Sequence, residues 1–214
     1  MVASADGRID CGMVDKISGD EYYSTLETLG CKSSVEGKVT NEHYYSRPGR
    51  YTPADATPAG NESWHKAVEA DNYHICPDTR GSLLWDADQE QPTLILLSEQ
   101  APAEYLDYLR GLGFSYIVTG ADKIDLPRAM EILHDEFGVE RLAVLGGGRI
   151  NGGFLTAGLI DELSLLLAPG IDGRSGQPAL FDGVADGDGF RPVKITLKSF
   201  ETVGDGVLWL RYAL

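Results

Sequence analysis

The sequence predicts an α/β protein with a mostly parallel central sheet flanked by helices. Between residues 93 and 168, short apolar runs typical of buried strands alternate with segments whose apolar residues recur at helical spacing. Parallel strands need long crossover connections, which are usually helices, so the alternation indicates repeated strand–helix–strand units. The chain of 214 residues is long enough for one full core, and we expect a single domain over residues 1–214.

The regular elements can be assigned in order along this region. Strands are expected over residues 93–97, 114–119, 141–145 and 162–168, and helices over residues 101–112, 126–137 and 151–159. Pro102 suits the first turn of the first helix, where a missing N–H group costs no hydrogen bond. Gly138 suits the end of the second helix.

The flanking segments are less regular. Helices are expected over residues 20–29 and 62–70, strands over residues 35–39 and 72–76, and a short strand before Ser4. Residues 193–202 and 207–212 alternate in hydropathy on either side of a Gly-Asp-Gly turn. This pattern predicts an antiparallel C-terminal hairpin.

Two stretches rich in Gly with Pro or Asp, residues 46–61 and 169–192, are expected to be loops. Loops longer than about 12–15 residues are usually functional or disordered, so the first loop either borders an active site or simply connects two elements. The acidic run 182–189 lacks the ligand spacing and the final Glu of an EF-hand loop. It therefore predicts a solvated turn rather than a calcium site.

The charge balance argues against some classes of function. The chain has 18 basic and 33 acidic side chains, a formal net charge of −15, whereas nucleic-acid binding depends on clustered Lys and Arg. We therefore expect no nucleic-acid partner and no membrane partner. The first residues lack the features of a signal peptide, and no apolar run approaches the roughly 20 residues of a membrane span. The expected location is the cytoplasm.

Cysteine and histidine provide no metal signature. Cys11, Cys31 and Cys76 are odd in number and lack C-x-x-C spacing, so we expect three reduced, packed thiols and no disulfide. The four His residues are scattered along the chain without metal-ligand spacing. His74 lies in an apolar strand and is expected to be a hydrogen-bonded core residue, whereas His134 is expected on the surface of a helix.

A run of three glycines, Gly146, Gly147 and Gly148, follows a buried strand and opens a helix, with Arg149 and Ile150 directly after it. Glycines at such a junction let backbone N–H groups approach a phosphate, and the helix N-terminus adds a favourable partial charge. The position is also favourable, because ligands of open α/β sheets bind outside the carboxyl ends of the strands. The alternative is tight packing between strand and helix.

Two further candidates for cofactor contact follow strands. In the run from Glu36 to Thr40, interpreted as a turn just past a strand, Gly37 permits close approach, Lys38 offers a cation and Thr40 a hydroxyl, all suited to the phosphates of a dinucleotide. The alternative is an ordinary turn. Ser98 ends the strand at residues 93–97 and can either cap the next helix or contact an adenosine ribose.

Three residues are candidates for contact with a substrate. Ser4 and Asp6 stand in a Ser-Ala-Asp-Gly turn that either lines a pocket or is simply a turn. Arg80 places a cation in the turn after residue 77, which is either a substrate contact or an ordinary surface residue. No G-x-S-x-G or H-E-x-x-H motif accompanies them, so nothing indicates a hydrolase of those types.

Taken together, these motifs resemble the pyrimidine reductases of riboflavin biosynthesis, which share the dihydrofolate reductase-like fold. The strongest segment is residues 142–163, from Leu-Ala-Val-Leu-Gly-Gly-Gly through Ile-Asp-Glu-Leu, followed by a strand and Pro169. The opening Ser-Ala-Asp-Gly at residues 4–7 and Gly-Lys-Val-Thr at residues 37–40 match the family's first two motifs, the latter with Lys for Arg. The resemblance covers nearly the whole chain and keeps the order of the motifs.

The resemblance implies a homodimeric, NADPH-dependent reductase that opens and reduces the ribose of a ribosylamino-pyrimidine phosphate to a ribityl chain. By the same match, the residues from Gly146 to Ile150 line the pyrophosphate and ribose of the cofactor. Lys38 and Thr40 approach its phosphates, with the 2′-phosphate as one candidate contact of Lys38, and Ser98 lies near the adenosine. Ser4 and Asp6 border the nicotinamide and the substrate, and Asp6 is a candidate for delivering a proton.

Two alternatives stay open. The first is a dihydrofolate reductase, or another reductase of imines, carbonyls or alkenes with the same fold. A dihydrofolate reductase needs a carboxylate for the pterin on its first helix, and Asp20, Glu21 and Glu27 are available there. The second is a nucleotide-binding module without catalysis.

Overall fold

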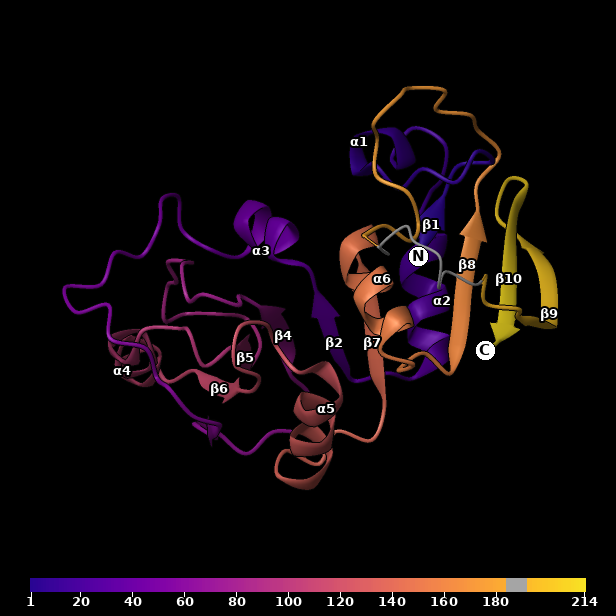
Figure 1. Cartoon of the computed structure of the whole chain (residues 1–214). Helices are drawn as coiled ribbons and strands as arrows, with labels where there is room; N and C mark the ends of the chain where they lie inside the picture. Colours follow the sequence, from indigo (N-terminus) through magenta and orange to yellow (C-terminus); the bar gives the residue numbers. More distant parts are fainter. Residues whose placement is uncertain (184–191) are drawn as a thin grey trace. The chain divides into compact units, whose positions relative to one another are not determined.

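The computed structural model describes residues 1–183 and 192–214 (Figure 1). The chain forms two compact units. We call residues 31–145 the central unit, and residues 1–30 together with 146–214 the terminal unit. The expectation of a single domain over the whole chain stays a prediction.

A six-stranded sheet organises the central unit. Its strands, in spatial order, are β3 (Ser63–His65), β6 (Ser115–Val118), β5 (Thr93–Leu97), β4 (His74–Pro77), β2 (Ser33–Glu36) and β7 (Leu142–Gly146). The strands β6, β5, β4 and β2 run parallel to their neighbours in that series, and β3 is antiparallel to β6. All residues of β4, β5 and β6 are buried, as expected for inner strands of a sheet covered on both faces.

Three helices connect these strands: α3 (Lys38–Tyr44), α4 (Ala103–Gly111) and α5 (Leu126–Asp135). The start of α5 is defined locally, because the Asp125 carboxylate accepts a hydrogen bond from the Arg128 N–H group and a proline stands in the first turn. Helix α4 packs Tyr105, Leu106 and Leu109 against the strands. These contacts form the main apolar core of the unit.

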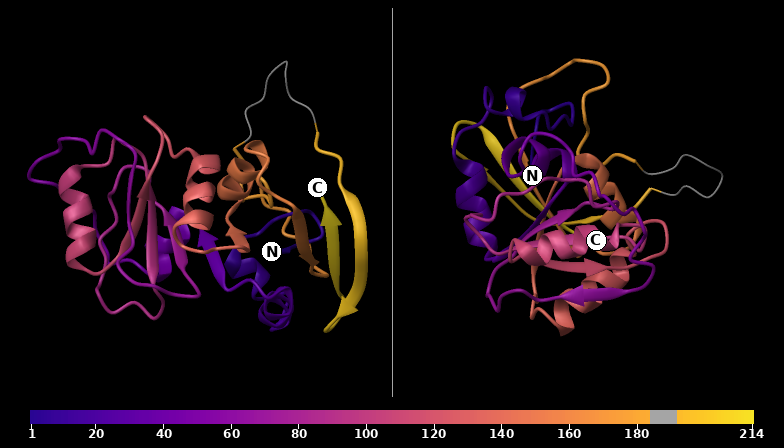
Figure 2. Two further views of the ribbon diagram at one scale, coloured as in Figure 1. Left: turned by 90° about the horizontal axis from the view of Figure 1, so that it is seen from below. Right: turned by 90° about the vertical axis from the view of Figure 1, so that its left-hand side faces the viewer.

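The terminal unit has a four-stranded sheet in the spatial order β1 (Val2–Ala3), β8 (Glu162–Leu167), β10 (Val207–Ala213) and β9 (Thr196–Val203). Strands β1 and β8 are parallel, and β10 is antiparallel to both β8 and β9, so the predicted hairpin is confirmed (Figure 2). The helices of this unit are α1 (Cys11–Val14), α2 (Glu21–Leu29) and α6 (Gly148–Thr156). Leu166 and Trp209 pack with side chains of α1 and α2 in a separate core.

The alternation of strands and helices from residue 93 to residue 168 is confirmed, but three local predictions are wrong. Residues 62–70 do not form a helix, because residues 63–65 pair with the edge of β6 as β3. The strand expected over residues 35–39 ends at Glu36, and Lys38 already begins α3. Helix α6 begins at Gly148, three residues before the expected start.

Several smaller expectations can be compared with the structure. Cys76 is buried and Cys31 half-buried, but Cys11 is exposed, so its predicted packing is wrong. Residues 46–61 contain no helix or strand, as expected. The acidic run 182–189 lies largely outside the described residues.

No helix in the described part of the chain is both long and apolar enough to cross a membrane. Among residues 1–183 and 192–214, no group of three or more His, Cys, Asp or Glu side chains is placed to hold a metal ion.

Candidate functional site

The central unit places Lys38 and Asp78 together at the carboxyl ends of two adjacent parallel strands. Lys38 follows β2 and Asp78 follows β4, and these strands pair directly. The Lys38 Nζ lies 2.7 Å from the Asp78 Oδ1. The Asp78 side chain is completely buried, whereas that of Lys38 is 33% exposed. The ion pair therefore joins an inner anion to a cation at the surface.

The buried Asp78 carboxylate is fully provided with donors. Its Oδ2 accepts hydrogen bonds from the backbone N–H groups of Ser82 and Leu83, at 2.6 and 2.8 Å. The Tyr105 hydroxyl lies 3.4 Å from the same oxygen and donates to the Leu83 carbonyl at 2.9 Å. Burial, together with the nearby Asp78, raises the pKa of Tyr105 far above its usual range, so this hydroxyl stays protonated. Asp78 thereby ties residues 82–83 to the end of β4.

This arrangement limits what Lys38 can offer a ligand. Its ammonium group donates to Asp78 and also contacts the Ser82 hydroxyl. An ammonium has three hydrogens, so one stays available on the exposed side. Because Asp78 neutralises most of the charge, Lys38 presents a directed donor rather than a full unpaired cation.

The other predicted residues of the central unit have different settings. Gly37 is the buried N-cap of α3, and Thr40 is half-buried within that helix. The fully buried Ser98 donates its hydroxyl hydrogen to the Thr79 carbonyl at 2.8 Å, so it links two strand ends rather than facing solvent. Arg80 is exposed, and its guanidinium has no hydrogen bond or ion pair within residues 1–183 and 192–214. It is therefore the more available cation at these strand ends.

In the terminal unit, the glycines around the start of α6 serve different purposes. A Cβ atom on Gly148 would lie 2.3 Å from the Ala179 carbonyl oxygen, and one on Gly152 would lie 2.0 Å from the Asp182 carbonyl oxygen. Both glycines are thus needed for close packing of the segment that contains residues 179–182. At Gly147 the nearest neighbour is an Ile9 methyl group at 3.8 Å. The packing interpretation holds for Gly148, whereas a side chain at Gly147 would meet only an ordinary van der Waals contact.

The first turn of α6 retains free donors. The Ile150 and Asn151 N–H groups donate to the Gly147 carbonyl, but those of Gly148 and Arg149 meet no acceptor in the described part of the chain. The preceding Gly146 has a φ of +94°, a conformation that favours glycine, and its peptide bond to Gly147 is cis. Unpaired N–H groups and the partial positive charge of a helix N-terminus suit an anion.

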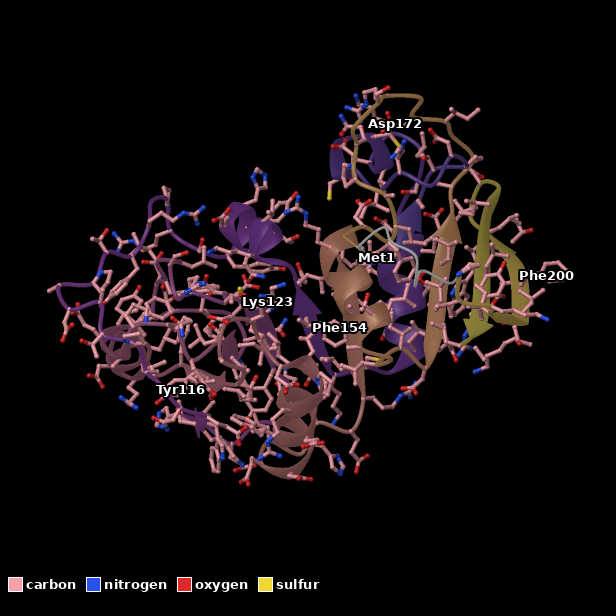
Figure 3. The ribbon with its side chains drawn as sticks, viewed as in Figure 1. Met1, Tyr116, Lys123, Phe154, Asp172 and Phe200 are labelled. Atoms are coloured by element: carbon pink, nitrogen blue, oxygen red, sulfur yellow. The ribbon has the colours of Figure 1, made fainter. Side chains whose placement is uncertain are left out.

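The Ser4–Asp6 turn is held by a dense set of hydrogen bonds. The Asp6 carboxylate accepts from the Ser4 hydroxyl at 2.6 Å and from the backbone N–H groups of Asp172 and Gly173 at 3.0 and 2.9 Å. Asp172 lies on the loop that follows β8, where it is labelled in Figure 3. These bonds, that of Ser4 above all, lower the pKa of Asp6 well below its usual range. Asp6 is therefore ionised at neutral pH, and its delivery of a proton stays a prediction.

Sequence reasoning missed some residues of this region. Asp78 is not among the candidates predicted from the sequence, although a buried strand followed directly by Asp is a signal for a polar group at the sheet's carboxyl edge. Tyr105 carries no such signal, because its role depends on contacts between distant segments. The predicted residues thus form one group in the central unit and another in the terminal unit, each described above by itself.

Comparison with known proteins now identifies the family. The family model described as the RibD C-terminal domain matches residues 34–209. This chain belongs to that family. The predicted resemblance to the riboflavin pyrimidine reductases is thereby confirmed.

Curated relatives of this RibD C-terminal domain protein carry related names. It is 35% identical over 121 residues to the 2,5-diamino-6-ribosylamino-4(3H)-pyrimidinone 5′-phosphate reductase of Methanothermobacter thermautotrophicus, covering 56% of this chain and 55% of the relative. It is 34% identical over 124 residues to the protein of the same name from Aquifex aeolicus, covering 56% and 53%. The matched part thus spans about half the length of these relatives.

Solved structures share the fold. A pyrimidine reductase-like protein from Corynebacterium diphtheriae matches with a TM-score of 0.71 at 18% identity, over 99% of this chain and 88% of that one. RibD from Acinetobacter baumannii matches with a TM-score of 0.70 at 18% identity, over 100% of this chain and 56% of that one. The predicted dihydrofolate reductase-like α/β fold of this RibD C-terminal domain protein is confirmed.

Proposed function

We propose that this protein is an NADPH-dependent reductase that converts the ribose of a ribosylamino-pyrimidine 5′-phosphate to a ribityl chain in riboflavin biosynthesis. The observation that carries the proposal is the start of α6, where the N–H groups of Gly148 and Arg149, without acceptors among residues 1–183 and 192–214, follow a glycine that no neighbour crowds. Membership in the RibD C-terminal domain family and the names of the curated relatives support the choice of substrate.

Each unit, taken by itself, offers groups that fit phosphates such as those of a nicotinamide dinucleotide. In the terminal unit, the N–H groups of Gly148 and Arg149, with Gly146, Gly147 and Ile150 around them, suit the pyrophosphate. In the central unit, the Lys38 ammonium and the Thr40 hydroxyl, beside Gly37, suit phosphate oxygens. Because the Ser98 hydroxyl donates to the Thr79 carbonyl, we propose that Ser98 supports the cofactor site by holding this strand end in place rather than by contacting the cofactor through its hydroxyl. The cofactor supplies the hydride when it is bound.

For contact with the substrate we propose two features, the Arg80 cation of the central unit and the Ser4–Asp6 turn of the terminal unit, each considered by itself. The exposed Arg80 guanidinium suits the 5′-phosphate of the substrate, because a planar fork of donors binds phosphate in bidentate fashion. Ser4 and Asp6 position the substrate border, since Asp6 holds the loop at Asp172 and Gly173 in one geometry. Hydride transfer to the carbonyl or imine carbon of the opened ribose must be completed by one proton, which we assign to water rather than to the ionised Asp6.

The decisive experiment measures dinucleotide oxidation with candidate acceptors. Purified protein is mixed with NADPH or NADH and with the ribosylamino-pyrimidine 5′-phosphate, dihydrofolate or a simple enone, and absorbance at the nicotinamide band is followed. We expect oxidation of NADPH with the pyrimidine and formation of one ribityl product per NADPH, seen by mass spectrometry. Turnover of dihydrofolate or the enone alone would reassign the substrate, and dinucleotide binding without any turnover would indicate a binding module.

Two further expectations belong to this proposal. The resemblance implies a homodimer, and sedimentation velocity at micromolar concentration should give about twice the monomer mass of 23.2 kDa. A cytoplasmic location is expected for an enzyme that uses cellular NADPH, and fractionation of cells that produce the full protein would check it.

A further inference from the structure

We propose that Asn41 and His74 are positioning residues for the Gly37–Thr40 turn, an inference that deepens the proposed function and rests on it for its link to the cofactor. Asn41 is completely buried in α3, and His74, at the start of β4, is 6% exposed. Neither was a candidate for contact with a ligand. Their hydrogen bonds nevertheless lead directly to the turn that carries Lys38.

The Asn41 side chain holds two carbonyl groups of that turn. Its Nδ2 donates to the Glu36 carbonyl at 2.9 Å and to the Gly37 carbonyl at 3.1 Å. The Gly37 carbonyl also accepts from the Asn41 backbone N–H group at 3.1 Å. Because the peptide unit is planar, fixing the Gly37 carbonyl also fixes the Lys38 N–H group and the start of the Lys38 residue. Asn41 thereby sets the direction in which Lys38 leaves the backbone.

His74 in turn determines the orientation of the Asn41 amide. With both Nδ2 hydrogens donated to carbonyls, the Asn41 Oδ1 is the group that faces the His74 Nε2, at 2.8 Å. An acceptor at that distance requires His74 to donate from Nε2, so the neutral ring carries its proton there. Burial lowers the pKa of His74 to about 4, which keeps the ring neutral at physiological pH, and the Asn41 Oδ1 selects the tautomer. A rotated amide would place two donors against each other and turn the Asn41 oxygen toward the carbonyls of Glu36 and Gly37.

The result is a connected series from β4 through α3 to the proposed cofactor turn. His74 belongs to β4, and the Asp78 that pairs with Lys38 follows the other end of the same strand. Strand β4 therefore fixes the turn at two points: His74 orients Asn41, which holds the turn's backbone, and Asp78 binds the Lys38 ammonium. The Tyr45 ring, whose centroid lies 4.4 Å from that of His74, packs against the imidazole and restricts its rotation.

The test uses two His74 variants that differ in where they place a donor. In H74Q the amide nitrogen can occupy the position of Nε2 and donate to Asn41, whereas in H74N the shorter amide cannot reach it. N41D is the matched change at the partner, because a carboxylate of the same shape cannot donate to the two carbonyls. The control is S33A, which removes another buried hydrogen bond beside β4, from the Tyr73 N–H group, just before β4, to the Ser33 hydroxyl of β2 at 3.0 Å, without touching the turn.

Two readouts are taken from each variant. The first is the dissociation constant for NADPH, from nicotinamide fluorescence. The second is hydrogen exchange of the segment 36–44 without dinucleotide, with exchange of β5 as the measure of general stability. We expect H74N and N41D to bind NADPH about 10-fold more weakly and to exchange faster in segment 36–44, while β5 is unchanged. H74Q and S33A should stay within twofold of the wild type in both readouts.

The outcomes separate the two proposals. Wild-type protein that binds no dinucleotide would refute the proposed function, and the exchange of segment 36–44 would still test the positioning role. Normal NADPH binding together with normal exchange in H74N and N41D would overturn the positioning role alone. Equal losses in S33A and H74N would also overturn it, because the effect would then follow general stability and not the Asn41 amide.

Discussion

The Lys38–Asp78 pair allows a quantitative test of how this protein carries a buried charge. In K38M the aliphatic stem is kept but the cation is lost, and the Asp78 carboxylate stays completely buried without a counter-charge. Breaking a buried ion pair from one side costs about 3–5 kcal/mol. Here Asp78 keeps the N–H donors of Ser82 and Leu83, and the Lys38 side chain is 33% exposed, so we expect about 2–3 kcal/mol of lost unfolding free energy.

A double-mutant cycle separates the pair from its surroundings. D78N removes the charge while keeping an oxygen acceptor, so it should cost about 1–2 kcal/mol, and the double variant should cost about 1–2 kcal/mol less than the sum of the two single changes. Urea unfolding followed by far-ultraviolet circular dichroism gives each free energy, provided that the m-value is unchanged.

The control uses the same chemistry at an exposed pair of the central unit. Lys32 and Asp71 lie 3.4 Å apart, but their side chains are 70% and 90% exposed. K32M should therefore change the unfolding free energy by less than about 0.5 kcal/mol. Additive single and double variants at Lys38 and Asp78, or equal effects of K38M and K32M, would refute the reasoning, because the buried carboxylate would then not depend on its cation.

Three further predictions follow from other contacts. Folding lowers the pKa of His74 from 6.5 to about 4, so the unfolded state binds more protons than the folded state between these pH values. The free energy of unfolding should therefore fall by about 2 kcal/mol from pH 7 to pH 5. Urea titrations at several pH values measure this dependence, and H74Q should flatten it. G152A should destabilise the protein by about 2 kcal/mol or more in thermal melts, because its Cβ would overlap the Asp182 backbone, whereas G111A, with nothing within 4 Å, should be neutral or slightly stabilising. D6N should lower kcat by roughly tenfold with little change in NADPH affinity, because the loop at Asp172 loses its anionic anchor; unchanged kcat in steady-state assays would contradict that role.

Local sequence patterns predict the helices and strands correctly where the residues of one segment are enough to determine its structure. The apolar run at β5, the periodicity of α4 and the Asp and Pro at the start of α5 each predict the element that forms. The helix expected over residues 62–70 does not form, because the pairing of β3 with β6 overrides the helical preference of these residues. No pattern within that segment shows that it will pair with strand β6, which lies about 50 residues later in the chain.

The candidate site divides along the same line. The glycine run could be recognised from the sequence, because three consecutive glycines between an apolar strand and a helix are typical of a close backbone approach, either to a ligand or to another segment. Which of these glycines are needed for packing could not be predicted, since this depends on a segment some 30 residues later that covers Gly148 and Gly152. The pairing of Lys38 with Asp78 likewise arises from the parallel register of β2 and β4, which no single turn specifies.

The placement of the tryptophans makes the two compact units separately visible to fluorescence. Trp85 is 1% exposed in the central unit and donates from Nε1 to the Tyr105 hydroxyl, whereas Trp209 is 7% exposed in the terminal unit and donates to Ser164. Trp64, 43% exposed, can be replaced by Phe to leave one indole in each unit. Each indole then reports by a red shift when its own surroundings open. Coincident red shifts in urea would show that the units unfold as one cooperative system, and separated shifts would give each unit its own free energy.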